Sequence, residues 1–277
     1  MIALNLPNSI FVDCTSSEAV TNHYESILAA NISIVTPNKK ANSGSFSKYE
    51  TLKKTARSRG VKFFYEANVG AGLPVINTMN DLLLSGDKVI CIEAVLSGTL
   101  NYIFSSFKEG TNFSDVVRDA KLKGYTEPDP RDDLNGMDVA RKILILSRET
   151  GLNLELADIT VENLVPEECR KVEDIEAFFQ CLKKHDAYFE KLRQSAEERR
   201  ERLRYMARLD EGQVKLGLTS VGESHPFYSL SGSDNIILLT TERYNERPMV
   251  IRGPGAGAEV TAAGVFADII RIGHYAR

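Results

Sequence analysis

The sequence predicts an α/β fold in which a parallel sheet is interrupted by an inserted α+β domain. Short apolar segments alternate with helix-like segments up to residue 65, which is the pattern of right-handed βαβ units. Between residues 70 and 252 helices and strands follow one another in a mixed order. Residues 253–277 then form a glycine-rich turn and an amphipathic helix suited to packing back on the first sheet.

The opening segment is predicted to contain strands at Ile10–Asp13, Ile32–Thr36 and Val61–Tyr65. Two capping boxes begin the helices between these strands, one from Thr15 to Glu18 and one from Ser47 to Glu50. The first helix is expected to end near Asn31, and the second at Gly60, which suits the C′ position.

The middle segment is predicted to contain both helices and strands. The helices are expected at Pro74–Ser85, Ser114–Gly124, Asn135–Thr150 and, as one long helical stretch, Asp174–Arg204. The strands are expected at Lys88–Leu96, Leu203–Leu209, Gln213–Ser220, Ile236–Thr241 and Met249–Ile251. The charged run Glu197–Arg202 indicates a solvated helix face with i,i+4 pairs rather than a binding surface.

Composition excludes several classes of partner. The 277 residues carry a formal net charge of −4, so neither nucleic acid nor an anionic membrane is expected to bind. Apolar runs are too short to span a bilayer and no signal peptide is visible, which predicts a cytoplasmic protein. The cysteines lie far apart and are interpreted as reduced thiols rather than disulfides or zinc ligands; they are Cys14, Cys91, Cys169 and Cys181.

Two glycine-rich segments have both a structural and a functional interpretation. The run Gly255-Ala-Gly257 opens a helix, where free N–H groups suit an anionic or polar ligand, although a tight turn explains it equally. Glu66 precedes several backbone carbonyls that lie close together in the sequence. These oxygens could form a cage for a hard cation, or the segment could be an ordinary turn. Because no G-x-G-x-x-G precedes Asp13, we expect the chain to start inside a dinucleotide-binding domain, with an N-terminally truncated Rossmann-type sheet.

The stretch from Gly124 to Lys142 is the most informative for chemistry. Two prolines hold a loop in which four acidic residues crowd together: Glu127, Asp129, Asp132 and Asp133. The helix that follows places Asp138 and Lys142 at i and i+4 on one face. An ordinary surface pair has this spacing too, but crowded acids favour a cation or an ammonium-bearing ligand. A lysine among carboxylates can exchange a proton with a substrate oxygen.

At these residues the chain resembles the homoserine dehydrogenases, in particular the dehydrogenase half of bifunctional aspartokinase–homoserine dehydrogenases. The motifs that carry the resemblance are Gly124–Lys142, Val35-Thr-Pro-Asn-Lys-Lys-Ala41, Asn68–Pro74, Leu96-Ser-Gly-Thr-Leu-Asn-Tyr-Ile103 and Gly255–Asp268. The resemblance implies reversible hydride transfer between NAD or NADP and the substrate pair L-homoserine and aspartate 4-semialdehyde, in threonine and methionine biosynthesis.

The resemblance also implies roles for individual residues. Lys142 resembles the acid/base lysine and Lys39 a second lysine near the reacting oxygen, while Asp138 and Glu127 would orient Lys142 and hold the substrate ammonium. The implied substrate contacts are Glu127, Asp133, Asp138, Tyr125 and, in a turn beginning at Gly98, Thr99 and Asn101. The implied cofactor contacts are Thr15, Ser16, Asn38, Lys39 and Gly257, and the implied sodium site is formed by Glu66, Val69, Ala71 and Leu73.

Three hypotheses follow for the function. The first is a homoserine dehydrogenase, which the set of lysines and carboxylates favours. The second is a substrate-binding and dimerisation module without turnover of its own, which the missing phosphate-binding loop and kinase half favour. A cation-binding regulatory protein rests on the acidic loop alone. The expected domains are 1–69 with 253–277, for the dinucleotide, and 70–252, for substrate binding, catalysis and homodimerisation through a shared sheet.

Overall fold

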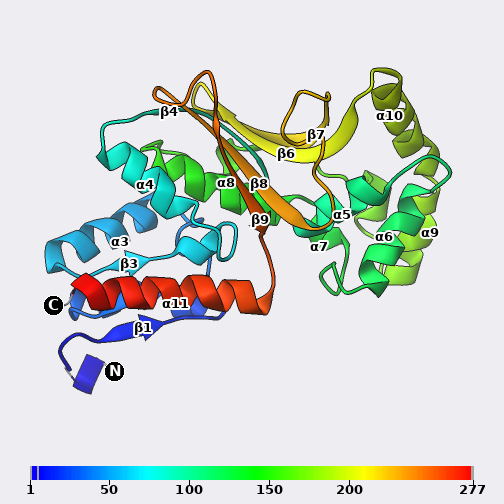
Figure 1. Cartoon of the computed structure of the whole chain (residues 1–277). Helices are drawn as coiled ribbons and strands as arrows, with labels where there is room; N and C mark the ends of the chain where they lie inside the picture. The colour runs from blue at the N-terminus through cyan, green and yellow to red at the C-terminus, as the bar shows by residue number, and fades with distance from the viewer. Residues whose placement is uncertain (1, 5, 276–277) are drawn as a thin grey trace.

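The computed structural model describes residues 2–4 and 6–275, and its chain forms two lobes (Figure 1). The first lobe contains a parallel sheet in the order β1-β2-β3, with β1 at Ile10–Val12, β2 at Ser33–Val35 and β3 at Phe63–Phe64. Its register pairs Ile10 with Ser33 and Ile34 with Phe63. The three predicted strands and their parallel order are thus confirmed.

Two helices of this lobe, α1 and α3, begin at serines, although not at the predicted residues. Ser17 accepts the Val20 N–H to begin α1 (Glu18–Thr21), and Ser45 accepts the Lys48 N–H to begin α3 (Phe46–Arg59). The predicted N-caps at Thr15 and Ser47 were therefore wrong by two residues. The first predicted helix is divided into α1 and α2 (Tyr24–Ala29), whereas α3 ends as predicted at Gly60, with φ of 68°.

The second lobe is built on a six-stranded mixed sheet in the order β5-β7-β6-β4-β8-β9. Its strands are β4 (Val89–Val95), β5 (Thr160–Val161), β6 (Arg202–Asp210), β7 (Gln213–Val221), β8 (Asp234–Thr241) and β9 (Met249–Pro254). All pairs are antiparallel except β5 with β7. Glu211 and Gly212 join β6 to β7 with positive φ at both positions, which suits the twist of a two-residue hairpin.

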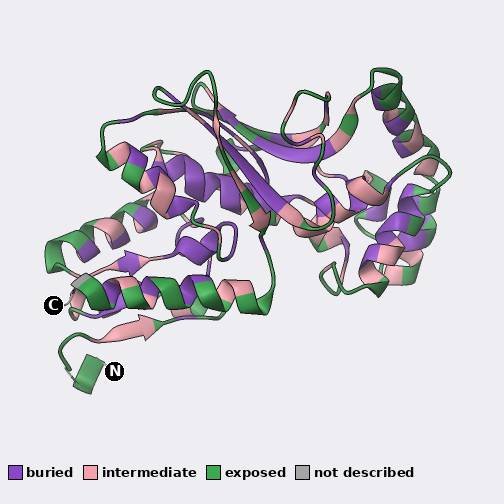
Figure 2. Cartoon of the chain, viewed as in Figure 1, coloured by how far each residue is buried: buried purple, intermediate pink, exposed green. Residues whose placement is uncertain are grey.

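Helix α8 (Met137–Glu149) lies between this sheet and the neighbouring α4 (Ile76–Leu84), and Figure 2 shows it as mostly buried. Residues 143–146 of α8 have no exposed surface, because the helix packs against β6 and β7 on one side and α4 on another. The remaining helices of this lobe are α5 (Gly98–Ser106), α6 (Phe113–Leu122), α7 (Arg131–Leu134), α9 (Ile175–Lys183) and α10 (Asp186–Glu198). Short 3-10 turns lie at Ile2–Leu4, Glu66–Asn68, Leu156–Asp158 and Glu167–Cys169.

The last helix, α11 (Ala258–Tyr275), returns to the first lobe and lies beside its parallel sheet (Figure 1). Val265 and Ile272 of α11 form an apolar cluster with Val35 of β2 and Ala67. Gly264 permits close approach, since a Cβ there would lie 2.7 Å from the Ala71 carbonyl oxygen. This return supports our proposal that residues 70–252 form an inserted domain.

Two predicted elements were wrong. The stretch 174–204 is not one helix, because α9 ends at Lys183, α10 begins after His185, and β6 begins at Arg202. The segment at Gly98 is the first turn of α5 rather than an isolated turn, and the Ser97 side chain accepts the Leu100 N–H as its cap. No helix of the described residues is both long and apolar enough to cross a membrane.

The interpretation of all four cysteines as reduced thiols was also wrong. Cys169 and Cys181 form a disulfide, with their Cα atoms 5.6 Å apart, whereas Cys14 and Cys91 are free. The bond forms because the turn at Glu167–Cys169 packs against α9, a tertiary contact that sequence spacing does not reveal.

The close approach at Gly264 gives a test of the packing of α11. We expect Gly264→Ala to lower the free energy of unfolding by about 1–2 kcal/mol, because the added methyl meets backbone atoms. The control is Gly273→Ala in the same helix, where an added Cβ would meet no atom within 4 Å. This variant should have a free energy of unfolding about 0.5–1 kcal/mol higher than the parent. Urea unfolding of both variants measures the difference, and equal stabilities would contradict the tight contact.

Candidate active site

The parallel strands of the first lobe end in a buried polar network. Asp13 follows β1, and its carboxylate accepts hydrogen bonds from the Tyr24 hydroxyl at 2.5 Å and from the Asn38 amide at 3.0 Å. The Thr36 hydroxyl donates to the Asp13 carbonyl oxygen and accepts the Asn38 N–H. Burial opposes ionisation of Asp13, but these donors and Thr15 lower the pKa of its carboxyl. The network holds the segment after β2 in a defined conformation.

The segment after β2 brings Lys39 to helix α8. The Lys39 ammonium lies 3.2 Å from one carboxylate oxygen of Asp138, and the Lys142 ammonium lies 2.9 Å from the other. The Lys142 ammonium also donates to the Leu96 carbonyl oxygen at 2.6 Å, at the end of β4. The structure therefore assembles three of the predicted catalytic residues into one cluster, Lys39–Asp138–Lys142.

Burial differs within this cluster. The Lys142 side chain is 11% exposed, whereas the Asp138 side chain is 50% exposed and opens to solvent. Although desolvation opposes ionisation, the ammonium groups of Lys142 and Lys39 hold the pKa of the Asp138 carboxyl well below its usual range. The cluster therefore keeps a carboxylate between two lysines across the whole physiological range of pH.

Helix α8 begins at a turn that the sequence supports. The Asn135 side chain accepts the Met137 N–H at 2.8 Å, and Gly136 has φ of 73°. A Cβ at Gly136 would lie 2.1 Å from the Tyr205 hydroxyl oxygen, so only glycine fits there. This turn places Asp138 in the first turn of the helix.

The acidic loop before α8 divides into two parts. Asp133 accepts the Glu127 N–H at 2.8 Å, and burial raises the pKa of the Asp133 carboxyl to about 6, with Glu127 and Asp138 adding to the shift. Asp129 instead pairs with Arg131 at 2.6 Å and does not join Asp133. Among the described residues, the Lys142 ammonium contacts the Leu96 carbonyl oxygen and the Asp138 carboxylate, and the predicted contact of Glu127 with Lys142 is not seen.

Of the remaining predicted substrate contacts, only Thr99 joins the acidic loop closely. Its hydroxyl donates to the Tyr125 carbonyl oxygen at 2.5 Å, and Thr99 is near enough to Asp133 to lower the pKa of that carboxyl against the effect of burial. The Tyr125 ring is exposed and lies 4.7 Å from the Tyr102 ring. Asn101 is buried, and its amide donates to loop carbonyls of residues 232 and 234, so it holds that loop and is not brought to the acidic residues.

The predicted cofactor contacts come from three segments. Thr15 and Ser16 are exposed just after β1, and Asn38 is buried after β2 beside Lys39. Gly257 is exposed and has φ of 119°, immediately before α11.

One residue beside Lys142 was missed by sequence reasoning. Asn235 is fully buried, and its amide donates at 3.3 Å to the same Leu96 carbonyl oxygen that accepts Lys142. A Cβ at Gly255 would lie 2.0 Å from the Asn235 side chain, so the glycine turn before α11 packs directly on this asparagine. The only signal in the sequence was the glycine at 255, and it does not identify its partner.

Glu66 has a structural role that the cation interpretation did not predict. Its two carboxylate oxygens accept the N–H groups of Ile76 and Asn77 at 2.8 Å each, at the start of α4. Burial raises the pKa of the Glu66 carboxyl to about 7 even though these donors favour its charged form. The side chain of Glu66 therefore caps the start of α4.

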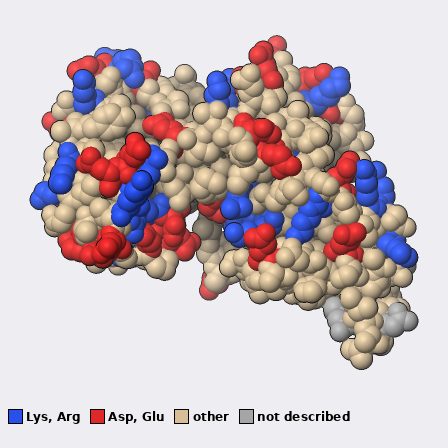
Figure 3. All heavy atoms as spheres, turned by 180° about the vertical axis from the view of Figure 1, so that it is seen from behind, with Lys and Arg blue, Asp and Glu red and all other residues tan. Residues whose placement is uncertain are grey.

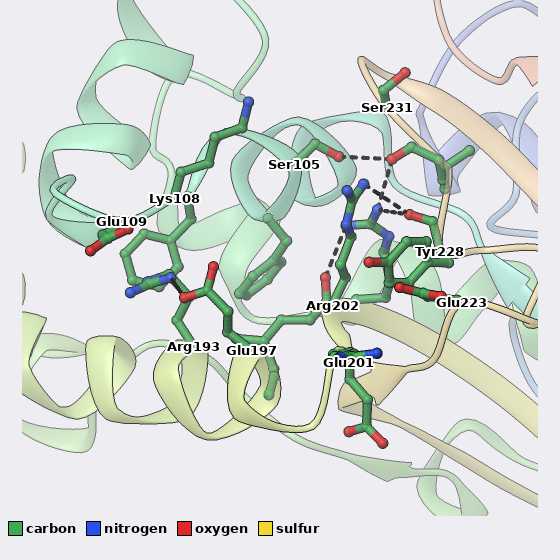
Figure 4. A pocket seen from close by; sticks show the side chains of 17 residues that line it. Ser105, Lys108, Glu109, Arg193, Glu197, Glu201, Arg202, Glu223, Tyr228 and Ser231 are labelled. Atoms are coloured by element: carbon green, nitrogen blue, oxygen red, sulfur yellow. Dashed lines mark hydrogen bonds and ion pairs between the residues drawn. The ribbon is translucent and has the colours of Figure 1, made fainter.

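Two surface features help to place the cluster. Figure 3 shows a notch between the lobes, with Lys and Arg side chains on one wall and Asp and Glu side chains on the facing wall. A separate cavity of about 570 Å³ lies between α5, α10 and β6 (Figure 4). Its charges are already paired in part, as in Arg193 with Glu197 and Arg202 over the Tyr228 ring, and no predicted site residue lines it.

The shared carboxylate gives a test of stability. We expect Asp138→Asn to lower the free energy of unfolding at pH 7 by about 1–3 kcal/mol, less than for a fully buried pair because Asp138 is half-exposed. Since the folded-state pKa is depressed, the contribution is present above the ordinary value of 3.8 and is lost as pH falls further. Urea unfolding at pH 7 and below pH 4 should show that the difference in unfolding free energy between Asp138→Asn and the parent becomes smaller at low pH. The control Asp132→Asn, at an exposed position, should stay within about 0.5 kcal/mol of the parent.

Comparison with known proteins identifies the family. A family model described as homoserine dehydrogenase matches residues 74–270, and the model of the homoserine dehydrogenase NAD-binding domain matches residues 1–66. Among curated proteins, homoserine dehydrogenase of Schizosaccharomyces pombe is 46% identical over 272 residues, covering 95% of this chain and 72% of that protein. The chloroplastic bifunctional aspartokinase/homoserine dehydrogenase 1 of Zea mays is 51% identical over 273 residues.

The match to the Zea mays relative includes 97% of this chain but only 30% of the length of that protein. Among solved structures, a Candida auris protein of unknown function has a TM-score of 0.92 at 43% identity, covering 96% of this chain and 76% of that one. A hyperthermophilic archaeal homoserine dehydrogenase in complex with NADPH has a TM-score of 0.74 at 27% identity, covering 97% of this chain and 72% of that one. On these matches to both of its lobes, the chain belongs to the homoserine dehydrogenase family.

Proposed function

We propose that the protein interconverts L-homoserine and L-aspartate 4-semialdehyde with NAD or NADP. The observation that carries the proposal is the Lys142 ammonium, which is buried, bonded to the Leu96 carbonyl oxygen and paired with Asp138. A buried ammonium held in this way is suited to donate a proton to an aldehyde oxygen, and in the reverse direction its conjugate amine would accept the proton of the hydroxyl. The match of residues 1–66 to an NAD-binding domain supports the nicotinamide cofactor.

The residues after β1 and β2 fit the nicotinamide end of a cofactor. Thr15 and Ser16 are exposed at the carboxyl end of β1, and Asn38 is fixed beside them by Asp13. Gly257 lies before the start of α11, where helix N–H groups suit an anionic or polar group. The cofactor would supply the acceptor or donor of the hydride.

The protein's own groups would then position the substrate. Lys142 and Lys39 would approach the reacting oxygen from the two sides of Asp138, which keeps both lysines near it. Asp133 and Glu127 would attract the substrate ammonium at the acidic loop. Lys142 is the better candidate for the proton transfer because its side chain is more buried than that of Lys39.

A sodium ion at residues 66–73 would rest mainly on main-chain oxygens, because each carboxylate oxygen of Glu66 already accepts an N–H group at the start of α4. The Leu73 carbonyl already accepts the Val75 N–H. Ala71 has φ of 54°, unusual for a residue other than glycine, which indicates a constrained turn. We therefore propose no step of the reaction that requires this ion.

Two further expectations stay proposals. A homodimer would use the six-stranded sheet, whose β6 and β7 line a hollow of about 740 Å³ with Met206, Leu216 and Leu218. The substrate-binding module without turnover is not favoured, since both the NAD-binding and the catalytic family models match the chain. A cytoplasmic location stays a prediction.

The role of Lys142 gives the first kinetic test. We expect Lys142→Ala to lower kcat/KM for homoserine oxidation, at saturating NAD or NADP, by about 10²–10⁴-fold, the usual contribution of a positioned acid or base. Lys40→Ala is the matched control, because Lys40 adjoins Lys39 without joining the cluster, and it should change kcat/KM by less than about threefold. Activity of Lys142→Ala within tenfold of the parent would refute the assignment.

The raised pKa of Asp133 gives a test of pH dependence. Because this carboxyl loses its proton only above about pH 6, substrate ammonium should bind weakly below that value. We expect KM for homoserine to rise by about tenfold per pH unit as pH falls below 6. Asp133→Asn should remove this rise and keep KM high at every pH, while Asp132→Asn keeps the profile of the parent. An unchanged profile in Asp133→Asn would assign the transition to another group.

A further inference from the structure

Four residues with metal-binding side chains meet where the turn Glu167–Cys169 packs against the end of α9. They are Glu168, Cys169, Cys181 and His185, and their ligand atoms all lie within 4.8 Å of one another. None of them belongs to the cluster Lys39–Asp138–Lys142 or to the acidic loop. The chemistry of two sulfurs, an imidazole and a carboxylate is that of a tetrahedral zinc site.

Local structure explains why these side chains converge. Cys181 lies in the last turn of α9, and His185 lies at the break between α9 and α10, so both side chains come close to the turn Glu167–Cys169. Phe178 and Leu182, with no exposed surface, anchor the end of α9 in the core. The convergence is therefore built into the packing and does not depend on a flexible surface segment.

Burial is graded across the four residues. Cys169 has no exposed surface and Cys181 is 8% exposed, whereas the side chains of His185 and Glu168 are 28% and 63% exposed. The imidazole Nε2 of His185 already lies 2.9 Å from a carboxylate oxygen of Glu168. The sulfur end is thus enclosed and the carboxylate end is open, which gives an ion a path from solvent.

We propose that, when the Cys169–Cys181 disulfide is reduced, these four residues bind one Zn²⁺ ion. Zinc bonds of about 2.3 Å to sulfur and about 2.0–2.2 Å to nitrogen and oxygen place tetrahedral ligands roughly 3.3–3.8 Å apart. The observed limit of 4.8 Å is compatible with that geometry after small side-chain rotations. Two buried thiolates would be costly without a cation, and zinc offsets their charge.

The disulfide and the zinc complex exclude each other. Two molecules of a small thiol would reduce the bond, giving two cysteine thiols and one small-molecule disulfide, with two electrons and two protons transferred to the protein. Zinc then replaces both thiol protons, which are released to solvent, and bonds to the two sulfurs. In the oxidised form the sulfurs carry no charge and bind zinc poorly.

Titration of the full chain with Co²⁺, a spectroscopic substitute for zinc, tests the proposal without any measurement of activity. A phosphine reductant opens the disulfide and is removed before the metal is added. We expect the reduced protein to bind one equivalent of Co²⁺, with thiolate-to-cobalt charge-transfer and tetrahedral d–d absorption that Zn²⁺ abolishes. The oxidised protein should show neither.

Variants identify the ligands. Cys181→Ser should lose the charge-transfer band or shift it strongly, and His185→Ala and Glu168→Gln should each weaken Co²⁺ binding at least about tenfold. Cys14→Ser and His23→Ala, at exposed positions outside the cluster, are the matched controls and should bind like the parent. His185→Ala and Glu168→Gln keep the disulfide, so their oxidised forms show by circular dichroism that the fold is intact. Absence of the absorption in the reduced parent, or its persistence in His185→Ala and Cys181→Ser, would overturn the proposal.

Discussion

The carboxylate of Asp138 connects the two lobes of the molecule. It receives Lys39 from the segment after β2 and Lys142 from its own helix, while Leu96 at the end of β4 accepts the second hydrogen bond of Lys142. Because the Lys142 ammonium is mostly buried, removing one of its partners is costly, and the contacts therefore depend on one another. The relative position of the parallel sheet and the inserted domain is therefore tied to the same atoms that we propose for proton transfer.

The packing of the surrounding elements holds this arrangement in place. Helix α8, which carries Asp138 and Lys142, is enclosed by the six-stranded sheet and α4, so its polar first turn projects from a rigid apolar body. The return of α11 closes the first lobe, and its preceding turn packs Gly255 against Asn235 beside the Leu96 carbonyl. A substitution at Gly255 would therefore disturb the site without touching a catalytic side chain.

The sequence predicts the local part of this design well and the long-range part poorly. The pair Asp138–Lys142 follows from helical spacing, and the parallel pairing of the first strands follows from the βαβ pattern, so both were predicted from the residues alone. The place of Lys39 near the reacting oxygen came only from the family resemblance, and its contact with Asp138 was not predicted, because no periodicity links segments so far apart. The Cys169–Cys181 bond and the role of Glu66 as the cap of α4 were missed for the same physical reason. Each depends on a tertiary contact that no local pattern contains.

The two aspartates that flank the start of α8 have opposite electrostatic environments. Lysines depress the pKa of Asp138, whereas burial near other carboxylates raises that of Asp133 to about 6. When neighbouring carboxyl groups have different pKa values, they can perform different roles in one site although their chemistry is the same. Asp138 stays charged and holds the lysines, so it is a poor proton donor at neutral pH. Asp133 gains its charge only above pH 6, which suits the recognition of an ammonium. The proton that moves to and from the substrate oxygen is therefore best assigned to Lys142.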